Sequence, residues 1–176
     1  MRIPVITAPI LAPALALVLL TACASDNRVE VCPGVNFVDG LQRVTAFGPT
    51  GGIDISNVTY SAQMVQLAAV CSFGRRGATV TAEFLLIADR GPADRERVAR
   101  LDYFVAVADA NGEILAKEVF RSAIPFADNR RRVGRKEEIE PFMPSPSGNR
   151  DFTGYRVLIG FQLSPEQVEF NKVHRR

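Results

Sequence analysis

Residues 103–120 read YFVAVADANGEILAKEVF, and this stretch decides the fold class because it predicts a β-hairpin. Residues 103–108 are apolar at every position, which is typical of a strand buried on both faces in the middle of a sheet. Asn111-Gly112 separates this run from a second one that ends at Phe120. An Asn-Gly pair between two apolar runs is the strongest short-range signal for a hairpin, because both residues tolerate positive φ.

Two further stretches alternate with a period of two, as strands with one buried face do. They cover residues 79–87 and 155–163. The positions predicted to face the core are Val80, Ala82, Phe84 and Leu86 in the first stretch and Tyr155, Val157, Ile159, Phe161 and Leu163 in the second.

The apolar pattern changes parity within residues 58–73. Val58 to Met64 keeps its apolar residues at even positions, whereas Val65 to Cys71 keeps them at odd positions. A straight strand cannot bury both sets, so we expect either a β-bulge near Met64 and Val65 or a strand that crosses from one sheet to the other. The sequence from Gly74 to Gly77 then predicts a tight connection.

The ends of the strands are marked by turn and cap signals. Residues 89–99 and 141–154 predict long loops, the first with one helical turn at Arg95 to Ala99. Ser164-Pro165-Glu166-Gln167 is a capping box with proline at the first helical position, and it predicts a short helix through about Lys172. The whole pattern predicts an all-β protein, an antiparallel β-sandwich of the immunoglobulin or fibronectin type with a short C-terminal helix; a small β-barrel is the alternative.

The N-terminus begins with Met1-Arg2, continues with a largely apolar run over residues 3–20, and closes with Leu20-Thr21-Ala22-Cys23. A positive start, an apolar middle and a small-residue end are typical of an export signal. The closing tetrad resembles the lipobox of bacterial lipoprotein precursors. A transmembrane helix and an ordinary secretory signal are the alternatives, although the prolines at 4, 9 and 13 disfavour an uninterrupted helix.

The resemblance implies cleavage before Cys23 and lipid attachment at Cys23. It divides the chain into a signal peptide (1–22), a lipidated tether (23–31) and a single β-rich domain (32–176). Residue 24 is alanine rather than the aspartate that retains lipoproteins at the inner membrane, so the resemblance favours the outer membrane and a periplasm-facing domain. Residues 24–31 reach at most about 25–30 Å, which keeps the domain close to the membrane.

The cysteine and charge content indicate a disulfide-bonded domain and disfavour a nucleic-acid-binding protein. With Cys23 acylated, Cys32 and Cys71 remain as a pair in an oxidising compartment, and we expect a structural disulfide worth about 4 kcal/mol rather than buried thiols or a redox pair. The chain carries 21 basic and 19 acidic residues. Such a balance provides no bulk attraction to nucleic acid.

Several residue groups are candidates for chemistry, and each has a plainer interpretation. The single histidine, His174, lies too close to the chain end to serve an oriented catalytic site. Residues 109–113 and 47–52 resemble a calcium loop and a phosphate loop only faintly, so we interpret them as a hairpin turn and a loop. Glu137, Glu138 and Glu140 offer paired carboxylates or simply a charged edge strand.

The charge block is the most specific candidate interaction site. It consists of Arg130, Arg131, Arg132, Arg135 and Lys136, which we expect to form a loop. Near a membrane such a cluster can contact anionic head groups, and it can equally recognise an acidic envelope protein. The glutamates that follow partly neutralise it, and a solvated loop is the plainer interpretation.

These features predict a non-catalytic, membrane-anchored envelope lipoprotein with a structural or assembly role and with no metal or cofactor. The alternative is a periplasmic β-sandwich that binds a small ligand or polysaccharide, which predicts a concave apolar pocket built from Tyr60, Tyr103, Phe104 or Phe142. An enzyme would require two convergent carboxylates in a cleft near Glu138 or Asp109.

Overall fold

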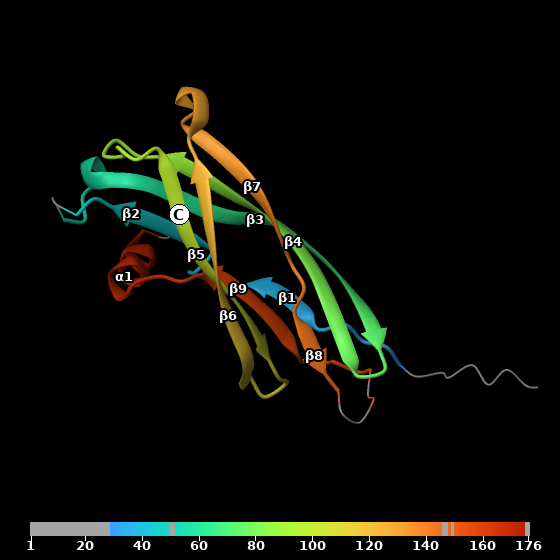
Figure 1. Ribbon diagram of the computed structural model, residues 1–176. Helices are drawn as coiled ribbons and strands as arrows, with labels where there is room; N and C mark the ends of the chain where they lie inside the picture. Colours follow the sequence, from blue (N-terminus) through green and yellow to red (C-terminus); the bar gives the residue numbers. More distant parts are fainter. Residues whose placement is uncertain (1–28, 50–51, 146–147, 149, 175–176) are drawn as a thin grey trace, which may run out of the picture.

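Two β-sheets pack face to face in the computed structural model, in which residues 29–49, 52–145, 148 and 150–174 are described (Figure 1). In chain order the elements are β1 (Gly34–Phe37), β2 (Arg43–Phe47), the 3-10 turn η1 (Ile55–Asn57), β3 (Val58–Gly74), β4 (Gly77–Arg90), β5 (Val98–Ala108), β6 (Ile114–Pro125), the 3-10 turn η2 (Ala127–Asn129), β7 (Arg132–Ile139), β8 (Phe142–Pro144), β9 (Arg156–Phe161) and α1 (Pro165–Val173).

One sheet, here called the β5 sheet, has the strand order β1-β9-β5-β6. The other, the β4 sheet, has the order β2-β3-β4-β7, and β8 pairs with β4 as well. The sheets do not close into a barrel, and the predicted all-β sandwich with a short C-terminal helix is confirmed. The pairs are antiparallel except for β1 with β9, which is parallel. A parallel pair needs a long crossover, and most of the chain lies between these two strands.

The core fills the space between the sheets, and alternation along each strand decides which side chains enter it. The predicted inward positions of residues 79–87 are buried, as are Val157, Ile159 and Phe161 of β9. Phe84 packs edge-on against Phe37 and Tyr103, with ring centroids 5.9 Å and 5.5 Å apart. Each such buried side chain contributes about 1.5–3 kcal/mol to stability.

The β5–β6 hairpin is confirmed, and β5 lies in the interior of its sheet between β9 and β6. Residues 103–108 are all buried, as their continuous apolar run predicts. The turn differs from the expected one because only Gly112 of the Asn-Gly pair adopts positive φ, at 87°. The Asp109 carboxylate accepts hydrogen bonds from the backbone N–H groups of Asn111 at 2.9 Å and Glu113 at 2.8 Å, which fixes a longer, bulged turn.

The parity change in β3 is a β-bulge. The β3–β4 register shifts between Val65 and Ala68, where Gln66 adopts a positive φ of 57°. The extra residue turns Leu67, Cys71 and Phe73 toward the core without moving the strand to the other sheet. The tight connection from Gly74 to Gly77 is also confirmed.

The expected helical turn at Arg95 to Ala99 is wrong. Val98 already begins β5, and Arg97 has a positive φ of 58°. The buried Asp94 carboxylate holds this loop by accepting hydrogen bonds from the Arg97 N–H at 3.0 Å and from Arg90 Nε at 2.6 Å. These side-chain contacts, rather than helical propensity, set the local conformation.

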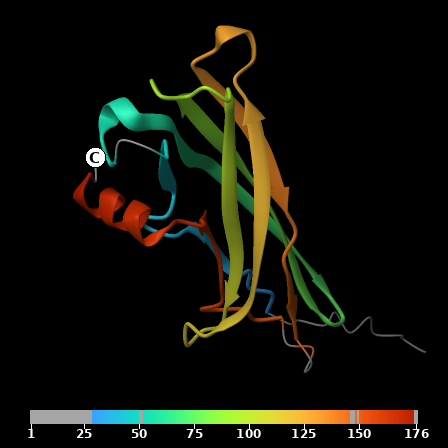
Figure 2. The ribbon, with the colours of Figure 1, turned by 60° about the vertical axis from the view of Figure 1, so that its left-hand side comes forward.

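Helix α1 lies against the open edge of β2 (Figure 2). Its capping box is confirmed: Ser164 Oγ accepts from the Gln167 N–H at 3.3 Å, and Gln167 Oε1 accepts from the Ser164 N–H at 2.9 Å. Asn171 Nδ2 donates to the carbonyl oxygens of Gly40 at 3.0 Å and Arg43 at 2.8 Å. The helix thereby covers an edge that would otherwise be open to pairing with another chain.

The Cys32–Cys71 disulfide is confirmed, with a Cα–Cα distance of 6.1 Å. It ties the segment before β1 to β3, so it links the two sheets. The same segment is held by backbone hydrogen bonds between Val31 and the loop before β9, from the Val31 N–H to the Arg150 oxygen at 3.0 Å and from the Phe152 N–H to the Val31 oxygen at 3.1 Å. The chain therefore enters the domain at a fixed place.

Candidate functional site

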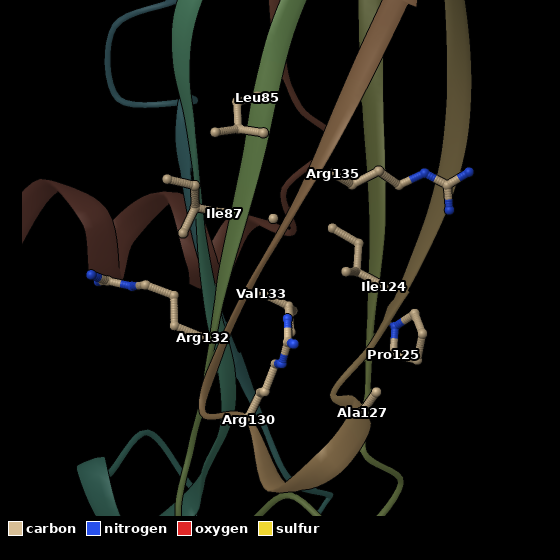
Figure 3. Close-up of a pocket in the computed structure, with 10 residues that line it drawn as sticks. Leu85, Ile87, Ile124, Pro125, Ala127, Arg130, Arg132, Val133 and Arg135 are labelled. Carbon is tan, nitrogen blue, oxygen red and sulfur yellow. The ribbon is translucent and has the colours of Figure 1, made fainter.

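The sandwich has one side on which the edge strands β6 and β7 face each other without pairing. A shallow recess of about 560 Å³ lies at the η2 end of this side (Figure 3). It has an apolar floor and a basic rim, and we call it the basic recess. The residues that line it are Leu85, Ile87, Ile124, Pro125, Ala127, Arg130, Arg132, Val133, Gly134 and Arg135.

The predicted charge block is not one loop. Arg130 and Arg131 lie in the connection after η2, whereas Arg132, Arg135 and Lys136 belong to strand β7. Strand alternation sends Arg132 and Arg135 to opposite sides of β7, as Figure 3 shows. The block therefore divides into groups with different surroundings.

Three of the five cations have ion-pair partners. Arg132 binds Asp89 through two nitrogens, with N–O distances of 2.7 Å and 2.9 Å, and these contacts raise the pKa of Arg132. Lys136 lies 2.6 Å from Glu83, and its hydrogen bond lowers the pKa of that carboxyl.

Arg135 and the two remaining arginines complete the block. Arg135 Nε lies 3.2 Å from Glu137, and its guanidinium also donates to the carbonyl oxygen of Ala123 on β6 at 3.2 Å. Arg130 and Arg131 are exposed and make no ion pair or side-chain hydrogen bond with the described part of the chain. They are the members of the block that are available to a partner.

A polar cluster bridges the two sheets beside the recess. The side chain of Glu137 is 17% exposed and points between the sheets. Its carboxylate accepts hydrogen bonds from Ser122 Oγ at 2.7 Å and from the Tyr103 hydroxyl at 3.2 Å. Burial, and then the negative charge of Glu137, raise the pKa of Tyr103 well above its usual range. This cluster, with Arg135, closes the middle of the β6–β7 side.

Sequence reasoning missed this cluster. It placed Glu137 among exposed carboxylates and gave Ser122 no role. The alternation of β7 does put Glu137 on the same face as Val133 and Ile139, which is the signal that was available. What the alternation cannot show is that β6 brings Ser122 opposite that face.

A second cleft, of about 720 Å³, lies farther along the same side. We call it the acidic cleft because Glu118, Glu138 and Glu140 line it, together with the exposed ring of Phe142. Glu140 also lies 3.4 Å from Thr81 Oγ1. Among the described residues, no group of histidine, cysteine, aspartate or glutamate side chains has an arrangement that could hold a metal ion.

The aromatic residues proposed for a shared pocket lie in separate places. The Tyr60 hydroxyl donates to the Arg100 carbonyl, and Tyr103 is buried and stacked on Phe120. Phe104 lies on the outer face of the β5 sheet beneath Lys117, whose Nζ is 4.4 Å from the ring centroid. Tyr60 and Phe142 line two different clefts, of about 580 Å³ and 720 Å³, so the four rings do not form one shared pocket.

The remaining candidates have structural surroundings. His174 follows α1 and stacks on Phe170, with ring centroids 4.1 Å apart. Residues 109–113 form the hairpin turn described above. In the 47–52 segment, of which 50 and 51 lie outside the described residues, Asn57 donates to the Gly48 carbonyl at 3.1 Å and the Gly52 carbonyl at 2.8 Å.

Cys23 and the signal segment 1–22 also lie outside the described residues. Within the part that the structure describes, no helix has the length and apolarity needed to cross a membrane. Comparison of the chain with protein-family models, with curated proteins and with solved structures found no match. The geometry of the domain and the motif at the N-terminus are therefore the features that point to a function.

Proposed function

We propose that the protein is a membrane-anchored bacterial envelope lipoprotein that works without catalysis, as a structural or assembly component. In this proposal residues 1–22 are removed, Cys23 is lipidated, and the β-domain faces the periplasm from the outer membrane. The observation that carries the interaction role is the basic recess, where Arg130 lies beside an apolar floor. Arg131 follows it in the chain, and neither arginine has an ion-pair partner among the described residues.

An apolar floor beside arginines is the arrangement that strong protein–protein contacts use. Arginine is enriched at energetic hot spots, and such residues act best next to apolar surface from which water is excluded. Ile124 and Pro125 supply that surface from β6, and Val133 supplies it from β7. The recess therefore suits an envelope protein that presents an acidic side chain next to an apolar one.

The position of the recess favours a protein partner over the head groups of the anchoring membrane. The Arg131 carbonyl oxygen accepts a hydrogen bond from the Arg90 N–H at one end of β4. The chain enters the domain near the other end of β4, where Gly77 lies. The 14 residues of β4 span about 45 Å at roughly 3.3 Å per residue. An upright domain holds Arg130 and Arg131 far beyond the Debye length of about 8 Å from the membrane charge.

The test is affinity capture of the full lipidated chain from membranes. Replacing Arg130 and Arg131 with alanine should weaken capture of the partner about 30-fold or more, which corresponds to the loss of one hot spot of about 2 kcal/mol. The Arg95→Ala variant is the control because it removes an exposed arginine that does not line the recess and makes no ion pair or side-chain hydrogen bond with the described residues. Equal capture by both variants would reject the basic recess as the interface.

The anchor is tested on the same material by intact mass spectrometry. The expected product begins at Cys23 and carries the mass of its acyl chains, and Cys23→Ser should abolish membrane retention because it removes the acylated thiol. A mature chain that begins elsewhere, or that lacks acyl mass, would reject the lipoprotein assignment.

A second candidate function is the binding of a small ligand or polysaccharide, and the acidic cleft favours it. Its volume of about 720 Å³ lies in the range of small-molecule sites, and Phe142 offers an exposed ring for stacking on a sugar or another flat group. Native mass spectrometry of the purified chain would show a bound molecule, and Phe142→Ala should release it.

A further inference from the structure

Three segments lie together at the end of the sandwich where the chain enters the domain. They are the residues around Cys32, the β3–β4 turn and the segment after β8. The Cys32–Cys71 disulfide joins the first to β3, and the Arg76 carbonyl accepts from the Ser145 N–H at 2.7 Å. In both Figure 1 and Figure 2 this end lies opposite η2. We call it the entry end.

The entry end carries exposed apolar side chains on each of its segments. Val29, Val70 and Phe142 are each more than half exposed. The strand register places Val70 opposite Thr81 and Phe142 opposite Thr79, close to the β3–β4 turn. They come from three different segments, so no single strand edge or hairpin explains them. Apolar side chains that project from one end of a domain can insert a short distance into a bilayer surface.

Arg75 and Arg76 form the tip of the β3–β4 turn at the same end. Both are exposed, and neither makes an ion pair or a side-chain hydrogen bond with the described residues. The neighbouring Glu30 does not offset them, because Arg150 pairs with it at 2.5 Å.

We propose that the entry end docks on the surface of an anionic lipid bilayer, with Arg75 and Arg76 on the head groups and Val29, Val70 and Phe142 at the interface. This inference rests on the proposed lipid anchor. Cys23 is six positions before Val29, so an extended tether holds the entry end within about 20 Å of the bilayer. Basic and apolar side chains on one face are the two contributions that membrane-surface binding combines.

Docking in this way sets the orientation of the domain relative to the membrane. The entry end lies on the membrane, and the long strands β3 and β4 carry the basic recess away from it. The two exposed arginine pairs, Arg75–Arg76 and Arg130–Arg131, then have different partners: the first meets lipid phosphates, and the second faces the periplasm. They also provide an internal comparison within one chain.

The test is arginine footprinting of the full chain in vesicles of phosphatidylglycerol and phosphatidylethanolamine, with phenylglyoxal as the reagent and peptide mass spectrometry as the readout. Modification of Arg75 and Arg76 should be roughly 30-fold slower on vesicles than in neutral detergent, which is about 2 kcal/mol for two arginines on an anionic surface. Arg130 and Arg131 should react equally in both. Equal reactivity of Arg75 and Arg76 in both would overturn the proposal.

Charge reversal provides the second arm. Arg75→Glu/Arg76→Glu should abolish the protection of residues 70–80 from hydrogen exchange that vesicles confer, and Arg130→Glu/Arg131→Glu should leave it unchanged. Protection that survives the first variant would also overturn the proposal. Intact mass separates the two failures: a lipidated chain with an unprotected entry end rejects this inference alone, whereas a chain without acyl mass rejects the anchor.

Discussion

Glu137 shows how one side chain connects the two sheets at their open side. Its carboxylate accepts hydrogen bonds from Ser122 and Tyr103 of the opposite sheet, and Arg135 of its own strand pairs with it. A carboxylate that points between sheets is costly unless it is hydrogen-bonded, and here each oxygen has a donor. The same group keeps β6 and β7 at a fixed separation beside the basic recess.

The pKa of Tyr103 predicts how stability changes at high pH. Burial and the Glu137 charge raise this pKa in the folded state, whereas an unfolded tyrosine loses its proton near pH 10. Above about pH 10 the folded chain therefore binds more protons than the unfolded chain, and the free energy of unfolding falls as pH rises. Tyr103→Phe should make this fall shallower by up to about 1.4 kcal/mol per pH unit in denaturant titrations between pH 8 and 12.

Ser122→Ala is the control for that measurement. It removes another donor to Glu137 and should lower stability by about 1–3 kcal/mol at pH 7. Because serine does not titrate in this range, the alkaline slope should match that of the parent protein. A Tyr103→Phe slope as steep as the parent slope would contradict the role of Tyr103.

At the scale of single elements, the two edges of the β4 sheet are protected from pairing with other chains in different ways, one by α1 and the other by the charges of β7. α1 covers β2 through hydrogen bonds from Asn171 and Gln167 to carbonyl oxygens of the β2 segment. β7 instead presents charged residues along its exposed edge, which is a common protection against pairing with other chains. The edge that presents charges is also the one beside the basic recess.

Asn171→Ala tests the cover over β2. Loss of two hydrogen bonds to backbone carbonyls should reduce the free energy of unfolding by about 1–3 kcal/mol and increase self-association through the uncovered edge. Denaturant titration and light scattering measure the two effects. Lys172→Ala, which removes only the exposed pair with Glu169, should cost no more than about 0.5 kcal/mol. Equal effects of the two substitutions would show that α1 does not protect β2.

At the scale of the whole molecule, the disulfide and the shared core make the two sheets one unit. The Cys32→Ser/Cys71→Ser variant should lose about 4 kcal/mol of stability because its unfolded chain regains the entropy of a loop of about 40 residues. Unfolding should remain a single transition, because Phe84 and Phe161 pack in a core that both sheets line. Cys32→Ser alone should cost as much as the double variant, since either change breaks the bond.

Two separate transitions in the double variant would contradict this view. They would show that the sheets hold together only through the covalent link. Calorimetry and near-ultraviolet circular dichroism distinguish the cases, because the core contains Tyr103 and several phenylalanines that report on packing.

Local pattern was sufficient for the parts of the fold that depend on neighbouring residues. The hairpin around Asn111-Gly112, the bulge in β3 and the capping box at Ser164 were all predictable, because each depends on contacts a few residues apart. The helical turn at Arg95 to Ala99 failed because Asp94, buried by tertiary packing, holds that loop through its carboxylate. The separation of Arg132 from Arg135 was missed because a charged run does not reveal that it belongs to a strand.

The sequence by itself determined the sandwich class and the cysteine pair, because alternation and cysteine content are properties of the chain before it folds. It is also the basis for the proposed anchor, since the resemblance of residues 20–23 to a lipobox is a property of a contiguous motif. Tertiary structure alone decided that Glu137 meets Ser122 and Tyr103, and that the two exposed arginine pairs lie at opposite ends of the molecule. The physical reason is that strand alternation says which face a residue takes but not which strand lies opposite. That pairing depends on how two whole sheets pack together.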